Sequence, residues 1–209
     1  MTIRFCDDLG RHGFSWIVEE PVTRASHALA TDDGVWLVDP VDWPEAIERA
    51  SALGPPAAVI QLLDRHNRDS AAIAERLGVP HLVVPTALPG SPFEVVEIRR
   101  TKRWQEIALW WPAPQILVVA EAVATNRFFP IGRDLAGVHP VLRLTPPRQL
   151  RAYAPEHLLV GHGVGIHGPD ATTALRQALS RSRLSAVRWA LTLPFRMLRK
   201  PKAASPGEG

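Results

Sequence analysis

Short apolar runs separated by glycine, proline, asparagine and aspartate recur along most of the chain. Runs of this kind, bounded by turn-forming residues, are typical of strands in a layered protein. Phe14, Trp16 and Val18 alternate toward one face, as a half-buried strand requires. The turn at 32–34 predicts a hairpin because an Asp-Asp-Gly sequence there joins two apolar runs. The predicted strands lie within residues 3–20, 26–31, 35–40, 59–63, 81–84, 93–99, 107–111, 115–120 and 158–160.

Helical patterns occur at residues 43–53, at 70–77 and from 170 onward. Pro44 suits the first turn of the first helix, and glycines at 54 and 78 end the first two. Asp69 or Ser70 is expected to cap the second helix, and Pro194 is expected to break the third. Short strands with interspersed helices predict a layered α/β or α+β fold, and periodicity alone does not choose between them.

The length of 209 residues fits one domain over residues 1–185, followed by a basic amphipathic helix at 186–200 and a disordered tail at 201–209. A single cysteine, Cys6, excludes an intramolecular disulfide. The first residues lack the apolar core of a secretory signal, and no apolar run is long enough to span a bilayer. A cytoplasmic location is therefore expected, with a membrane-peripheral one as the alternative.

Charge is divided unevenly along the chain. Residues 1–170 carry 16 lysines and arginines against 20 aspartates and glutamates, whereas residues 171–209 carry 8 against 1. The basic, partly aromatic segment 186–200 has the composition of a helix that binds an anionic membrane surface. The alternatives are that its apolar face docks on the domain or forms a homodimer contact. Nucleic-acid binding is not supported, because the basic residues form no recognised motif.

Three polar residues stand at the ends of apolar strands or directly after them: Asp69, Glu121 and His162. Strand ends can meet at one edge of a layered sheet, so we expect these three side chains to converge there. Each also has an ordinary structural interpretation. Asp69 is suited to a helix cap, Glu121 to a salt bridge and His162 to a tight turn.

The order of these landmarks resembles the metallo-β-lactamase superfamily across residues 14–170. Residues 26–40 resemble its opening hairpin, with Asp39 in the place of the acidic residue that ends the second strand. Residues 65–70 stand where that family has its His-x-His-x-Asp-His motif. Residues 118–122 resemble the strand before its metal-bridging aspartate, and 161–163 match its Gly-His-Gly turn. The resemblance implies a four-layer αβ/βα sandwich.

The sequence departs from this family at the metal ligands. Arg65, Asn67 and Ser70 take the three histidine places of the motif, and segment 102–106 lacks the later histidine. The resemblance therefore implies that the first metal site is lost. A guanidinium group stays protonated, so Arg65 brings a permanent positive charge to a place that otherwise holds a cation.

The resemblance implies that a second metal site keeps three ligand places, at Asp69, Glu121 and His162, with Ser70 in the fourth. His66 lies nearby in the motif and is a further candidate. Two carboxylates and an imidazole suit one Zn, Fe or Mn ion. The alternative is a metal-free site in which Arg65 pairs with Asp69 and Glu121.

We expect a decayed metal site with no cofactor, in a non-catalytic protein that binds or scaffolds an unidentified small molecule or protein. The first alternative is a divergent hydrolase that retains one metal. The second is a peripheral membrane adaptor that acts through 186–200. Ser70, His162 and Asp69 also have the residue types of a nucleophilic triad, although residue types without geometry carry little weight.

Overall fold

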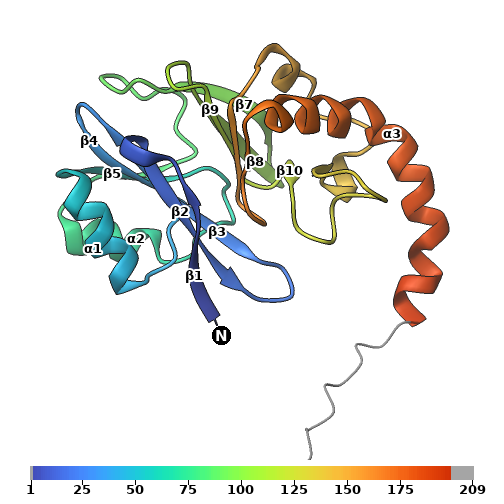
Figure 1. Cartoon of the computed structure of the whole chain (residues 1–209), viewed down its shortest axis with the longest axis horizontal. Coiled ribbons are helices and arrows are strands. Elements are labelled where there is room, and N and C mark those ends of the chain that lie inside the picture. Colours follow the sequence, from blue (N-terminus) through green and yellow to red (C-terminus); the bar gives the residue numbers. More distant parts are fainter. Residues whose placement is uncertain (1, 199–209) are drawn as a thin grey trace, which may run out of the picture.

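Two β-sheets face each other, with helices on both outer sides (Figure 1). The computed structural model describes residues 2–198, and side chains for 2–184 and 186. The order of layers is helices α1 and α2, a six-stranded sheet, a five-stranded sheet, and helix α3 (Figure 1). This arrangement confirms the αβ/βα sandwich and resolves the choice of class in favour of mixed α+β.

The first sheet has the strand order β1-β2-β3-β4-β5-β6. Its first four strands form an antiparallel meander, and β5 and β6 continue it in parallel to β4. The hairpin predicted around residues 32–34 is the β3–β4 hairpin. The strands are β1 (Thr2–Asp8), β2 (Gly13–Glu19), β3 (Arg24–Thr31), β4 (Gly34–Val38), β5 (Pro56–Gln61) and β6 (His81–Val83).

The second sheet has the order β13-β12-β9-β8-β7, with β9 and β12 parallel. Strands β10, β11 and β13 have two residues each, too short to be visible as apolar runs in the sequence. The strands are β7 (Glu94–Thr101), β8 (Trp104–Trp111), β9 (Ile116–Val119), β12 (His157–Val160) and β13 (Ile166–His167), and the separate pair is β10 (Val123–Ala124) with β11 (Gly137–Val138).

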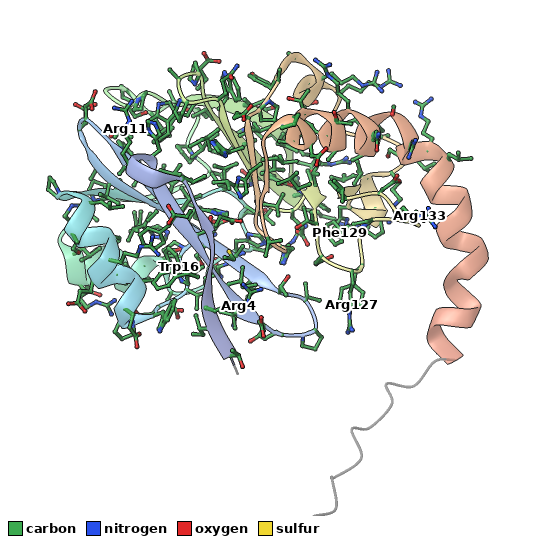
Figure 2. All side chains as sticks on the ribbon, viewed as in Figure 1. Arg4, Arg11, Trp16, Arg127, Phe129 and Arg133 are labelled. Carbon is green, nitrogen blue, oxygen red and sulfur yellow. The ribbon has the colours of Figure 1, made fainter. Side chains whose placement is uncertain are left out.

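Side-chain alternation divides the core into two layers. On β4, Val35 and Leu37 pack toward the helices α1 (Pro44–Leu53) and α2 (Ser70–Leu77), whereas Trp36 and Val38 face the second sheet. Trp16 on β2 belongs to the helix-facing layer and lies between its strand and these helices (Figure 2). The period of two in the sequence thus buries both faces of the first sheet.

Helix α3 (Pro169–Leu198) is one continuous helix, so the expected break at Pro194 is wrong. A proline inside a helix removes one backbone hydrogen bond, and the helix can continue past it with a bend. The first part of α3 covers the second sheet, and its last part extends away from the domain (Figure 1). Leu175 and Leu179 are buried as the helical spacing indicates, whereas Leu184 is exposed.

The expected separate helix at 186–200 therefore begins as a continuation of α3, and its residues 199 and 200 lie outside the described part of the chain, as does the tail at 201–209. The side chains that would contact a membrane or a second copy also lie outside that part. Within the described residues, no helix is both long and apolar enough to cross a membrane.

The parallel pairings bring several strand ends to one edge of the sandwich. Strands β4 and β5 end there at Val38 and Gln61, and β9 and β12 end there at Val119 and Val160. The polar segments that follow these strands consequently meet at this edge, which we call the site edge.

Candidate functional site

The side chain of Arg68 holds the site edge together. Its guanidinium group donates to the backbone carbonyls of Ala25, Asp39 and Gly161, with 2.6 Å to Asp39 and 3.0 Å to Gly161. Ala25 and Asp39 belong to the first sheet and its loops, whereas Gly161 follows β12 of the second sheet. The backbone amide of Ala25 also donates to the Gly161 carbonyl, at 2.8 Å. One side chain therefore joins the two sheets.

Both Asp39 and Arg68 adopt a left-handed backbone conformation, with φ values of 45° and 42°. For residues other than glycine this conformation costs on the order of 1 kcal/mol or more and persists only where surrounding contacts impose it. The hydrogen bond from Arg68 to the Asp39 carbonyl supplies such a contact. Burial lowers the pKa of Arg68, while the nearby carboxylates of Asp39, Glu121 and Asp69 oppose that change.

A second guanidinium group, that of Arg65, neutralises Glu121. The Arg65 Nη2 atom lies 2.8 Å from Glu121 Oε2, and its guanidinium carbon lies 4.1 Å from the centre of the Trp104 ring. His139 Nε2 lies 3.6 Å from the other carboxylate oxygen of Glu121. The predicted pairing of Arg65 with Glu121 is thus present, whereas the carboxylate of Asp69, the other predicted partner, accepts from the Asp42 amide.

Beneath this pair lies a fully buried carboxylate, Glu106. Its Oε1 accepts from the backbone amides of Glu121 at 2.7 Å and Ala122 at 2.8 Å, and its Oε2 accepts from the Trp104 indole at 2.7 Å. Burial raises the pKa of Glu106 to about 7, although these three donors oppose the rise. Glu106 thus fixes both the backbone of Glu121 and the ring that faces Arg65.

Two histidines lie side by side at the same edge. The rings of His66 and His162 have centroids 5.2 Å apart at an interplanar angle of 82°. His66 Nδ1 lies 3.0 Å from Asp39 Oδ2, and His162 Nδ1 donates to the Thr23 carbonyl at 2.7 Å. The structure therefore brings His66 into the site, as the sequence suggested, and gives it Asp39 as its partner.

Burial, followed by the neighbouring His66, lowers the pKa of His162 to about 4. With its Nδ1 proton directed at a carbonyl, neutral His162 keeps its lone pair on Nε2. Burial raises the pKa of Asp39, but His66, Arg68 and the amide of Leu62 outweigh it and lower the pKa overall. Asp39 is consequently ionised at neutral pH.

The carboxylate of Asp69 is bound by the loop that follows β4. Its Oδ2 accepts from the backbone amide of Asp42 at 2.8 Å, and it makes no side-chain cap bond to α2. The expected cap is therefore wrong, because the loop after β4 competes successfully for this carboxylate.

Ser70 is fully buried, and its hydroxyl has no hydrogen-bond partner among the described residues. Ser70 and Asp69 thus form no triad with His162. Asn67 accepts from Gln61 Nε2 at 3.2 Å.

The Gly161-His162-Gly163 turn is tight for a steric reason. A Cβ atom at Gly161 would lie 2.2 Å from the carbonyl oxygen of Ala120, and one at Gly163 would lie 2.2 Å from Thr125 Oγ1. Gly163 also has a φ of 114°, which other residues rarely adopt. Both glycines allow the backbone after β12 to approach its neighbours and place His162 at the edge.

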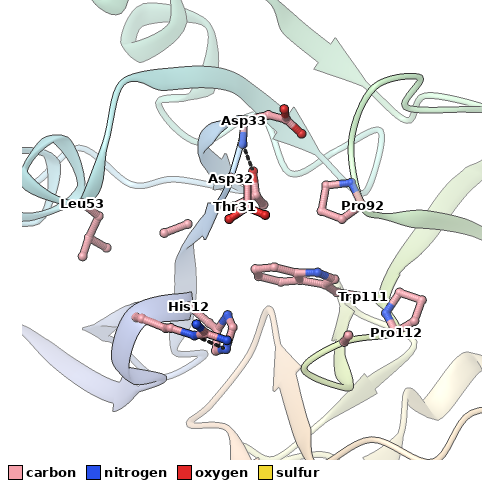
Figure 3. Close-up of a pocket in the computed structure, with 11 residues that line it drawn as sticks. His12, Thr31, Asp32, Asp33, Leu53, Pro92, Trp111 and Pro112 are labelled. Carbon is pink, nitrogen blue, oxygen red and sulfur yellow. Dashed lines mark hydrogen bonds between the residues drawn. The ribbon is translucent and has the colours of Figure 1, made fainter.

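Three open pockets lie in the described structure away from the two histidines themselves. One of about 650 Å³ borders the site edge at Thr23, Asn126 and Gly163, and another of about 410 Å³ borders Trp104. A third, also about 650 Å³, lies at the opposite end of the sandwich, where the Trp111 ring sits between Thr31 and His12 (Figure 3). That third pocket contains none of the residues predicted for the site.

Several residues that shape the site were missed by the sequence analysis: Arg68, Glu106, Trp104 and His139. Arg68 lies within the polar segment 65–70, but no local pattern indicates that an arginine there is buried. Glu106 lies in segment 102–106, where a histidine was sought. Its position just inside an apolar strand was the one available signal that it is buried.

Comparison of the sequence with protein-family models gives no match, and comparison with curated proteins gives none either. Solved structures, however, share the fold. A metallo-β-lactamase from Pontibacter korlensis has a TM-score of 0.64 at 13% identity, covering 87% of this chain and 99% of its own. One from Erythrobacter litoralis has a TM-score of 0.60 at 10% identity, covering 87% and 92%. One from Hirschia baltica has 0.58 at 12% identity, covering 87% and 98%. The chain therefore has the metallo-β-lactamase fold, as the resemblance implied.

A metal ion is implied by the names of these structures, but the residues of this chain do not fit one. Within residues 2–198, as far as side chains are described, no group of three or more histidine, cysteine, aspartate or glutamate side chains is placed to hold a metal. Of the four candidates, His66 and His162 are adjacent. Glu121 is engaged by Arg65, and Asp69 is engaged by the Asp42 amide.

Arg68→Lys should destabilise the protein by about 2–3 kcal/mol, because one ammonium group cannot reach three diverging carbonyls and charged hydrogen bonds contribute roughly this much. Arg68→Met should destabilise the protein more, since it removes the guanidinium donor from all three carbonyls, although the Gly161 carbonyl keeps the Ala25 amide. Chemical denaturation measures both. The control is Arg176→Lys at an exposed position, which should change stability by less than about 0.5 kcal/mol. Equal stability of all four proteins would contradict the role given to Arg68.

Comparison with Glu106→Gln should show that the buried carboxylate of Glu106 lowers the free energy of unfolding once it is ionised. The pKa of Glu106 is raised in the folded state, so the wild type binds more protons folded than unfolded between pH 4.5 and about 7. Its stability relative to Glu106→Gln should therefore fall as the pH rises through this window, by on the order of a few kcal/mol, and level off above it. Urea unfolding of both proteins from pH 5 to pH 8 measures the difference. A difference independent of pH would contradict the raised pKa.

Proposed function

We propose that this chain is a non-catalytic binding protein in which two guanidinium groups replace the metal ions of the metallo-β-lactamase fold. The observation that carries the proposal is Arg68, whose side chain bonds three backbone carbonyls from both halves of the sandwich. Metal ions organise a site by drawing ligands from different elements toward one positive charge. Arg68 performs the same task here with a covalently attached charge.

Charge compensation supports the proposal. Arg68 lies close enough to Asp39, Glu121 and Asp69 for each of these carboxylates to act on its pKa. Arg65 forms a direct ion pair with Glu121. The carboxylates that remain from the metal-binding pattern thus face arginine, which supplies positive charge there without a divalent cation.

The arrangement of nucleophiles and bases also favours binding over catalysis. Among the described residues Ser70 has no hydrogen-bond partner, and the Nδ1 atom of His66 is occupied by Asp39. Ser15 and His27 are hydrogen-bonded at 2.8 Å, but both are almost completely buried, and a substrate cannot reach them. Activation of a nucleophile requires a base within hydrogen-bond reach and access for the substrate.

Elemental analysis of the purified, untagged protein tests the proposal, beside the double variant Asp69→Ala and His162→Ala. We expect less than about 0.1 equivalent of zinc, iron or manganese in both proteins after loading with excess metal and desalting, because the donors do not converge.

Near-stoichiometric metal in the wild type that disappears in the double variant would overturn the proposal and favour a one-metal hydrolase. The matched control is Asp32→Ala with His12→Ala, which removes the same residue types at the opposite end of the sandwich. If metal were bound and lost in this control as well, its binding would be nonspecific and at the surface, which agrees with the proposal that the site edge holds no metal.

A further inference from the structure

A pocket lined by three basic residues lies beside Arg65, at the turn between β7 and β8. The pocket has a volume of about 410 Å³, which falls within the range of small-molecule sites. Its lining consists of three cations, one hydroxyl and two apolar side chains, and contains no carboxylate: Arg99, Thr101, Lys102, Arg103, Trp104 and Val141.

The three cations have no acidic partner in the part of the chain whose side chains are described. Arg100, the fourth cation of this turn, is paired with Glu97 at 2.9 Å, whereas Arg99, Lys102 and Arg103 form no ion pair. The Thr101 hydroxyl donates to the Trp104 carbonyl and holds the turn closed. The pocket is thus left with three unneutralised positive charges.

This concentration is unusual for the chain that carries it. Residues 1–170 contain fewer basic than acidic residues, yet four of their 16 lysines and arginines fall within residues 99–103. A surface that merely keeps a protein in solution mixes both signs of charge. Three unpaired cations around one cavity create a local positive potential that attracts an anionic ligand.

The apolar part of the lining narrows the ligand class. Val141 is 72% exposed beside the cations, and Trp104, which is largely buried, also lines the pocket. A single carboxylate would neutralise only one of the three charges. A phosphate ester carries about two negative charges and three acceptor oxygens, and arginine recognises it with two parallel hydrogen bonds.

We infer that this pocket binds the phosphoryl group of a phosphorylated small molecule whose apolar portion packs on Trp104 and Val141. Arg99 and Arg103 bind the phosphoryl oxygens, and Lys102 adds a mobile charge at the mouth. The inference rests on the proposed binding function, to which it adds a ligand class. Zinc content tests the proposed function independently of this pocket. The pocket cations are neither the two site arginines, Arg65 and Arg68, nor any of the predicted metal ligands.

Pyrophosphate is the probe, titrated into the isotope-labelled protein at constant ionic strength and followed by amide and indole NMR signals. We expect saturable shifts that are largest at residues 101–104 and at the Trp104 indole. The pocket variant is Arg99→Gln, Lys102→Gln and Arg103→Gln. The control variant, Arg133→Gln, Arg176→Gln and Arg183→Gln, removes the same net charge at exposed positions elsewhere. Affinity should fall about tenfold or more in the pocket variant and less than about twofold in the control.

A lipid headgroup offers the same phosphoryl chemistry, so co-sedimentation with phosphatidylcholine vesicles, with and without phosphatidic acid, forms the second arm. Binding that requires phosphatidic acid and is lost in the pocket variant, without saturable pyrophosphate binding, would support phosphoryl recognition and identify a lipid as its source. Equal weakening in both variants, or no binding in either arm, would overturn the inference. Urea unfolding of both variants checks that the pocket variant is folded. Its midpoint should match that of the control variant.

Discussion

The hydrogen bonds from Arg68 to three backbone carbonyls are the constraint on which the site edge depends. Ala25 lies near the start of β3, whereas Asp39 follows β4 and Gly161 follows β12 beyond the ends of their strand ladders. A planar guanidinium with several fixed donors can satisfy acceptors that lie in different directions. The strained backbone of Asp39 and of Arg68 itself is maintained by this arrangement. The loops that carry His66, His162 and Asp39 are positioned as a result.

In the function that we propose, the exchange of a divalent metal for arginine changes what the site edge can do. A metal ion with an open position activates water, whereas a guanidinium group offers donors and a charge but no acidic bound water. The Arg65–Glu121 pair is stacked on Trp104, and Trp104 is held by the buried Glu106. The same tryptophan also lines the basic pocket. The Trp104 ring therefore connects Arg65 to the pocket that we assign to ligand binding.

The order of strands and helices could be predicted from the sequence, but the hydrogen-bond and ion-pair partners of the site side chains could not. Strand ends were visible because apolar runs stopped at polar residues, and the parallel strands brought those ends to one edge. The break at Pro194 was not borne out, because local propensity does not decide whether a helix continues. Asp69 was expected to cap α2, but its carboxylate accepts a hydrogen bond from the amide of Asp42, which is distant in sequence, and makes no cap. Arg68 and Glu106 were overlooked because burial of a charge depends on tertiary partners that no local pattern contains.

The most direct test of the account is NMR of the arginine side-chain N–H groups with and without excess zinc. The account predicts slowly exchanging Arg68 N–H signals, protected by the three carbonyls, that keep their chemical shifts when zinc is added. Broadening or loss of these signals on zinc addition, with matching shifts at His66 and His162, would show that a metal displaces the guanidinium group and would contradict the account.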